Sequence, residues 1–139
     1  MGNMSWESAV RDRLIEDAAV AALIGSGSDG GPSIDWGELR QGAQRPAIEL
    51  KLVSDRRPTT HDGFDSIRAS RVRAMVQAAT RAEVAALREA AIAALVPPGS
   101  YSGVWFDRAE VDLLRDAGGP TATGFVHADS VDFVFWHKG

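Results

Sequence analysis

The residues best suited to chemistry are His61, Asp62 and Asp65, which lie close together in one polar stretch. A histidine beside carboxylates can bind a metal ion or serve as an acid–base pair. Their spacing fits no known pattern of metal ligands, and an Asp-Gly turn in a solvated loop accounts for the same residue types. We therefore interpret this stretch as a surface loop, with a small metal-dependent hydrolase built on these three residues as the enzymatic alternative.

Two further residue patterns resemble functional motifs but lie in the wrong structural context. Residues 25–30 read G-x-G-x-x-G, but a dinucleotide fingerprint leaves a strand, whereas this one follows a predicted helix. The carboxylates in residues 107–116 are interleaved with arginines, which is typical of a solvated strand face and less often of a cation site. No serine or threonine is marked as a nucleophile in a strand-turn-helix elbow. The sequence predicts no catalytic residue, no metal ligand and no cofactor, so the protein is not expected to be an enzyme.

Composition places the chain among ordinary globular domains. Its 139 residues are 45% hydrophobic and 24% charged, which suits one domain over residues 1–139. The net charge of -4 argues against nonspecific capture of nucleic acid, which needs clustered Lys and Arg. The absence of cysteine excludes disulfides and thiolate zinc sites. Neither a targeting sequence nor an apolar stretch long enough to cross a bilayer is present, so no membrane contact is expected.

The elements that would position these residues begin with a helix. Ser5 can cap a helix that starts near Trp6, because apolar residues recur there at helical spacing. A loop rich in Gly and Ser follows at 25–31. Ile34 and Trp36 then suggest a short strand, and residues 47–53 alternate apolar and charged side chains as a strand with one wet face does.

The second half repeats this alternation of strand and helix. A strand around residues 71–77 precedes Thr80 and Glu83, which form a capping box at the start of an alanine-rich helix. Two strand-like regions follow, at 103–114 and 123–137. The order helix, strand, strand, helix, strand, strand predicts an α+β fold, in which a mainly antiparallel four-stranded sheet packs against helices in two layers.

Aromatic residues indicate a surface that meets other proteins. Trp105 and Phe106 are adjacent, as are Phe135 and Trp136, and neighbours on a strand point to opposite faces. Some of these rings therefore face a partner, unless helices cover the second face of the sheet or Trp136 is a lone aromatic at a sheet edge. Together with the polar loop and the short strand, they define the predicted contact residues for neighbouring subunits: Arg56, Arg57, His61, Asp62, Phe64, Trp36, Trp105 and Trp136.

The order of these segments resembles the tail terminator family of phages and prophages, whose members are also called tail completion or head-tail joining proteins. The resemblance spans nearly the whole chain and is carried by core and cap residues in sequence. These are the stretch 17–25, Pro46-Ala47-Ile48, Asp62-Gly63 before Arg71-Val72-Arg73, the segment 80–84 with the alanine-rich helix, and the terminal Asp132-Phe133-Val134-Phe135-Trp136.

What the resemblance implies is a structural virion protein that assembles as a ring, typically of six subunits. Such a ring caps the tail tube at its head-proximal end, stops polymerisation of the tube protein and joins the tail to the head connector. Assembly would take place in the cytoplasm of a bacterial host. The alternative is a neck or head-completion protein of the same particle, which has a similar size and assembles in a similar way. The source stays open between an infectious phage, a prophage and a gene transfer agent, as does whether the tail contracts.

Two expectations about the ring follow. The polar loop at 55–65 is a candidate contact with the tube protein or the connector. DNA passes through related rings without specific binding, and an acidic subunit suits this passage because a lumen that held phosphates tightly would retard it. We therefore expect a lumen that is not dominated by Lys and Arg.

Overall fold

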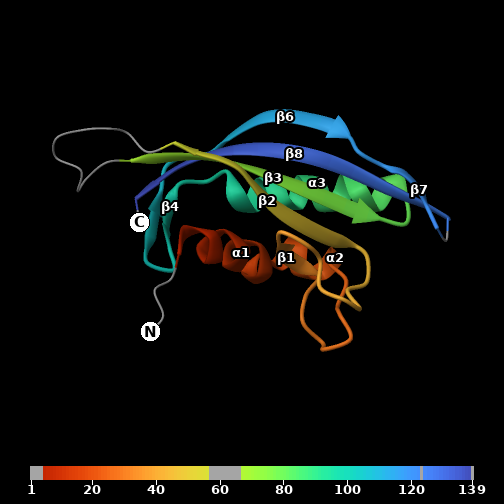
Figure 1. The fold of residues 1–139 in the computed structure, drawn as a ribbon. Coiled ribbons are helices and arrows are strands. Elements are labelled where there is room, and N and C mark those ends of the chain that lie inside the picture. The colour runs from red at the N-terminus through yellow and green to blue at the C-terminus, as the bar shows by residue number, and fades with distance from the viewer. Residues whose placement is uncertain (1–4, 57–66, 123, 139) are drawn as a thin grey trace.

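A computed structural model describes residues 5–56, 67–122 and 124–138 of the chain. Three helices lie on one side of a curled sheet (Figure 1). In chain order the elements are α1 (Trp6–Glu16), α2 (Ala18–Leu23), β1 (Ile34–Trp36), β2 (Ala47–Arg56), β3 (Arg68–Ala78), α3 (Arg81–Leu95), β4 (Gly99–Tyr101), β5 (Val104–Phe106), β6 (Glu110–Asp116), β7 (Gly119–Thr121) and β8 (Gly124–Lys138).

Polar caps set the helix starts, two of them at Ser5 and Thr80 as the sequence predicts. The Ser5 hydroxyl accepts a hydrogen bond from the amide of Ser8 at 3.1 Å and begins α1. Asp17 follows α1 and caps α2, accepting from two amides at its start. The Thr80 hydroxyl accepts from the amide of Glu83 at 3.2 Å and begins α3. These contacts satisfy amide donors that have no partner within their own helix.

β8 is the strand around which the sheet is organised. Along one edge it pairs with β3 over the whole length of β3, and along the other it pairs with β5, β6 and β7 one after another. β2 lies outside β3 and is antiparallel to it, whereas β1 runs parallel to β2. The main path of the sheet is therefore β1-β2-β3-β8-β5-β4, with β6 and β7 added beside β8.

The predicted fold class is wrong in its sheet. The described residues are 46% strand and 26% helix and form an eight-stranded, curled, mixed sheet, not a mainly antiparallel four-stranded one. The region 103–114 is predicted as one strand, but it contains β5 and the start of β6, separated by residues 107–109, which belong to no strand. The parallel pairing of β1 depends on a long-range contact with β2, which local alternation does not reveal.

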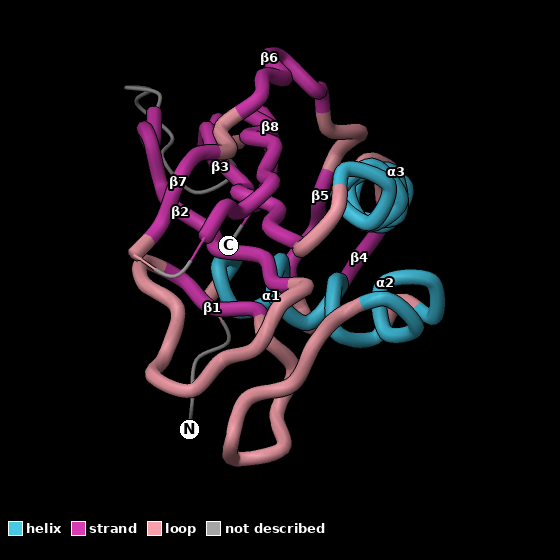
Figure 2. Tube along the Cα trace, turned by 90° about the vertical axis from the view of Figure 1, so that its right-hand side faces the viewer, coloured by secondary structure: helices cyan, strands magenta, loops and turns pink. Residues whose placement is uncertain are grey.

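The core lies between the helices and the inner face of the sheet. Along β3 the even-numbered residues Ser70 to Ala78 are buried and the odd-numbered ones are half-buried, so one face meets the helices and the other does not. Phe106, Phe133 and Phe135 are fully buried in this core. Viewed from the side, the helices gather beneath one face of the strands, which leaves the outer face of β3 and β8 without a helix (Figure 2).

Candidate assembly surface

The structure separates the predicted aromatic contact residues. Trp105 is 46% exposed, and Trp136 is half-buried on the outer face of β8. Trp36 instead packs inside the subunit: its indole nitrogen donates to the carbonyl of Glu7 at 2.8 Å, and its ring meets Trp6 edge to face at 5.8 Å. Trp105 is therefore the exposed one of the three, while Trp36 and Trp136 are both half-buried, and a contact role for any of them stays a prediction.

Arg56 and Trp136 come together although they are far apart in the sequence. They line a shallow hollow of about 230 Å³ on the outer face of the sheet, along with Ser54, Ala69, Arg71 and Val134. The guanidinium and indole groups give this hollow a cationic and aromatic character. The other predicted contacts, Arg57, His61, Asp62 and Phe64, lie outside the described residues.

Ion pairs tie three strands together across the outer face. Arg71 on β3 lies 2.6 Å from the carboxylate of Asp112 on β6 and 3.5 Å from that of Asp132 on β8. Arg73 lies 2.9 Å from Asp132. The hydrogen bond that Arg71 donates to Asp112 raises the pKa of Arg71, and the bond that Arg73 donates to Asp132 raises that of Arg73. Arg71 and Arg73 are thus paired with carboxylates within the subunit.

A second set of ion pairs holds α3 against β8. Asp129 is 1% exposed, and its carboxylate accepts hydrogen bonds from Arg81 at 2.9 and 3.0 Å and from Arg88 at 2.7 Å. Bonding from Arg81, with Arg88 adding to it, outweighs burial and lowers the pKa of Asp129. A buried carboxylate with two cationic donors stays ionised and fixes the helix on the strand.

One serine and histidine pair meets at the end of the sheet. The Ser70 hydroxyl lies 2.9 Å from Nε2 of His137 and donates to Asp55 at 3.1 Å. Both Ser70 and His137 are 0% exposed. In a catalytic triad the carboxylate orients the histidine, whereas here it accepts a hydrogen bond from the serine, and the hydroxyl is closed to any substrate. No local pattern predicts this contact, which joins β2, β3 and β8.

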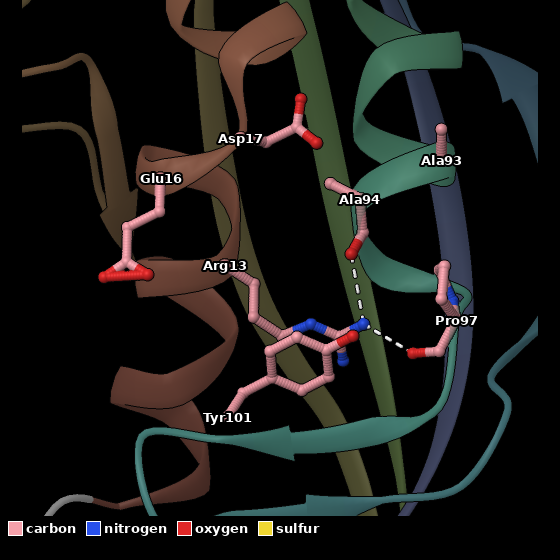
Figure 3. A pocket seen from close by; sticks show the side chains of 7 residues that line it. All are labelled: Arg13, Glu16, Asp17, Ala93, Ala94, Pro97 and Tyr101. Carbon is pink, nitrogen blue, oxygen red and sulfur yellow. Dashed lines mark hydrogen bonds between the residues drawn. The ribbon is translucent and has the colours of Figure 1, made fainter.

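A cavity of about 300 Å³ between α1 and α3 contains a buried arginine (Figure 3). Arg13 donates to the carbonyl oxygens of Ala94 and Pro97 at 3.0 and 2.7 Å, and its guanidinium lies 3.8 Å from the centre of the Tyr101 ring. Burial lowers its pKa. Glu16 and Asp17 also line the cavity, so it does not favour an anion. Arg13 binds the free carbonyls at the end of α3, which is a structural role.

Exposed apolar side chains on β6 are the feature that sequence reasoning missed. All seven residues of β6 are exposed, and Val111, Leu113 and Leu114 are 39%, 43% and 43% exposed. The charged residues around them made this segment resemble an ordinary solvated strand. The adjacent leucines were the available signal, because a regular two-residue alternation places neighbours on opposite faces. A register shift between Val111 and Leu113 marks the bulge that breaks the alternation.

The part of the chain that the structure describes contains neither a group of possible metal ligands nor a membrane-spanning helix. No group of three or more His, Asp or Glu residues there lies close enough to hold a metal ion. None of the helices described combines the length and the apolar character needed to cross a membrane.

Comparison with known proteins identifies a structural relative. No protein-family model matches the chain, and no curated protein matches it. Among solved structures, the chain is similar to a chain in the "Virion of native gene transfer agent (GTA) particle". The TM-score is 0.63 at 18% sequence identity, and the match covers 96% of this chain and 94% of that chain. The two chains therefore share a fold over nearly their whole lengths.

Proposed function

We propose that the protein is a structural virion subunit that caps the tail tube as a ring, stops tail polymerisation and joins the tail to the head connector. The observation that carries this proposal is the fold shared with a chain of a gene transfer agent virion. The order of caps and strands that resembles tail terminators supports it from the sequence. Exposed strand edges and the exposed ring of Trp105 supply surfaces on which a small subunit can meet its neighbours.

The proposed partners are further copies of this chain in a ring of six, the tube protein on one side and the head connector on the other. DNA would pass through the lumen without specific binding. This role needs binding surfaces and no bond-breaking step. The predicted contacts at Arg56 and Trp136 lie on the uncovered outer face, where a partner can approach.

Tube assembly in vitro tests the proposal. Purified tube protein of the same particle is polymerised with and without this protein, and the products are examined by negative-stain electron microscopy and native mass spectrometry. We expect rings at one end of each tube and an end to tube growth. A subunit that is monomeric alone but closes into a ring on tube ends also agrees, because a template can stabilise weak interfaces. A stable monomer in both conditions would refute the proposal.

The same assay separates the alternatives. Rings that bind the isolated connector and leave tube growth unchanged would assign the protein to the neck. A hydrolase that uses His61 and Asp62 is tested by replacing both with alanine. Tube capping that survives this double substitution leaves that hydrolase without support.

A further inference from the structure

Two of the unpaired strand edges among the described residues are those of β6 and the second half of β2. β6 pairs with β8 on one side, and no described strand pairs with it on the other. β1 covers β2 only from Ile48 to Leu50, so residues 51–56 of β2 pair only with β3. Unpaired amides and carbonyls along a strand edge recruit another strand unless they are covered.

Both open edges carry exposed apolar side chains near their middle. On β6 these are Val111, Leu113 and Leu114, and on β2 they are Leu52 and Val53, which are 39% and 43% exposed. Large apolar groups gathered on an unpaired edge are typical of a protein interface. The two edges also overlap in position along the strand direction. β6 pairs with residues 129–134 of β8, and the open part of β2 aligns through β3 with residues 132–136 of the same strand.

The two edges differ in charge. On β6, Asp112 is paired with Arg71, which leaves Glu110, Arg115 and Asp116 and a net negative charge. On β2, Asp55 accepts from Arg68 and Ser70.

The remaining charges of the open part of β2 are Lys51 and Arg56, both positive. Two such edges placed side by side in antiparallel register would bring these cations together, which is unfavourable. A second β2 edge is therefore a poor partner for this one, and the acidic β6 is a better one.

Strand direction also suits a join between the two different edges. β2, β3, β8 and β6 are each antiparallel to the next. Rotation about an axis parallel to the strands keeps every direction unchanged, so β6 of one copy beside β2 of the next continues the antiparallel order. A join between two different surfaces repeats from copy to copy and can close into a ring.

We infer that β6 of one copy pairs with residues 51–56 of β2 in a second copy, so that neighbouring sheets join edge to edge. This interface rests on the proposed function only in that the repeated join closes as a ring. In the antiparallel register that brings Glu110 to Arg56, Leu113 faces Ser54 and Leu114 faces Leu52. The irregular positions Asp112 and Val53 then lie on either side of the Leu113–Ser54 pair. This register also places Arg115 opposite Lys51, a like-charged pair.

Cysteine cross-linking tests the join directly, because the chain contains no cysteine of its own. The variant carries Leu113→Cys and Ser54→Cys. Within one subunit these positions are separated by β3 and β8, roughly 14 Å at the usual strand spacing, which is too far for a disulfide. Mild oxidation of assembled protein should give a ladder of covalent oligomers. The single variant Leu113→Cys should give none, and dimers from it would instead show β6 paired with β6, which overturns the inference.

Exchanging the charges of Glu110 and Arg56 tests the proposed join independently. Glu110→Arg and Arg56→Glu should each weaken assembly about fivefold per junction, and the double variant should restore it. Glu38→Arg and Arg45→Glu, which change exposed residues elsewhere by the same charge, serve as matched controls. Thermal melting establishes that every variant folds.

Arg115→Glu separates the two possible occupants of the β6 edge. It should strengthen the proposed join, where residue 115 meets Lys51. It should weaken an antiparallel β6–β6 join, where residue 115 meets Glu110. Rings that form but respond to none of these changes would overturn the inference and leave the proposed function standing. No assembly by the wild-type chain, alone or on tube ends, would overturn both.

Discussion

Replacing Asp129 with asparagine should destabilise the protein more than any comparable change in a surface ion pair. The asparagine keeps the shape of the side chain but removes the charge that binds Arg81 and Arg88. The change breaks the link between β8 and α3 without opening a cavity. It therefore isolates the electrostatic contribution to this contact.

The size of the effect follows from burial on the two sides of the pair. Removing one partner of a fully buried pair costs about 3–5 kcal/mol. Here the carboxylate is buried, but the side chains of Arg81 and Arg88 are 45% and 20% exposed, so water can solvate the cations left behind. We therefore expect a loss of about 2–3 kcal/mol in the free energy of unfolding at pH 7.

The loss should depend on pH with a definite sign. Bonding from Arg81 and Arg88 holds the pKa of Asp129 below that of an ordinary carboxyl, so its stabilisation is complete above the unfolded-state pKa of about 3.9. That stabilisation disappears as pH falls from there through the lower folded-state pKa. The wild type and Asp129→Asn should therefore differ most at neutral pH and converge in acid.

Urea unfolding followed by tryptophan fluorescence at pH 7 and in acid measures this difference. Asp112→Asn is the control, because the side chains of Arg71 and Asp112 are 32% and 45% exposed, so water screens this ion pair and it should contribute little. Equal stability of the wild type and Asp129→Asn at pH 7 would refute the reasoning, as would a difference that grows in acid.

Three further substitutions test other contacts by the same unfolding measurement. Arg13→Ala should lower the free energy of unfolding by about 2–3 kcal/mol, because the buried Arg13 side chain no longer donates to the carbonyls of Ala94 and Pro97; no change would contradict the structural role given to Arg13. Thr80→Ala should cost about 1 kcal/mol through the lost cap of α3, whereas Thr80→Ser should be nearly neutral. Phe133→Ala should cost about 3–5 kcal/mol, since the ring is fully buried and stacks on Phe135 at 5.6 Å; a loss below 1 kcal/mol would mean that the core is packed differently.

The parts of the fold that depend on neighbouring residues could be predicted from the sequence. Ser5 and Thr80 begin helices because a short side chain accepts a hydrogen bond from an amide three residues further along. Such a contact can be predicted from the local residue types. The strand expected at 47–53 is confirmed as part of β2, and the strand at 123–137 corresponds to β8. Each of them has a clear local pattern.

The parts that depend on distant partners could not be predicted. β1 is short and gains its hydrogen bonds from β2, and β6 departs from regular alternation because its bulge lies against β8. The contact of Ser70 with His137 joins the start of β3 to the end of β8, and these residues are 67 positions apart in the chain. For the candidate surface, the sequence indicated that aromatic residues would occupy both faces of the sheet, and Trp105 is exposed. The sequence did not indicate which strand edges of the sheet would stay unpaired.

The position of β8 in the chain has a consequence for biosynthesis. β3, β5, β6 and β7 all precede β8, so the edge by which each pairs with β8 leaves the ribosome before that partner exists. The sheet is therefore completed late, and its central pairing of β3 with β8 joins residues as distant in sequence as Arg68 and His137, which makes folding slow. During that interval the apolar residues of β3 and β6 are open to incorrect association, which makes the nascent chain a natural client for a chaperone.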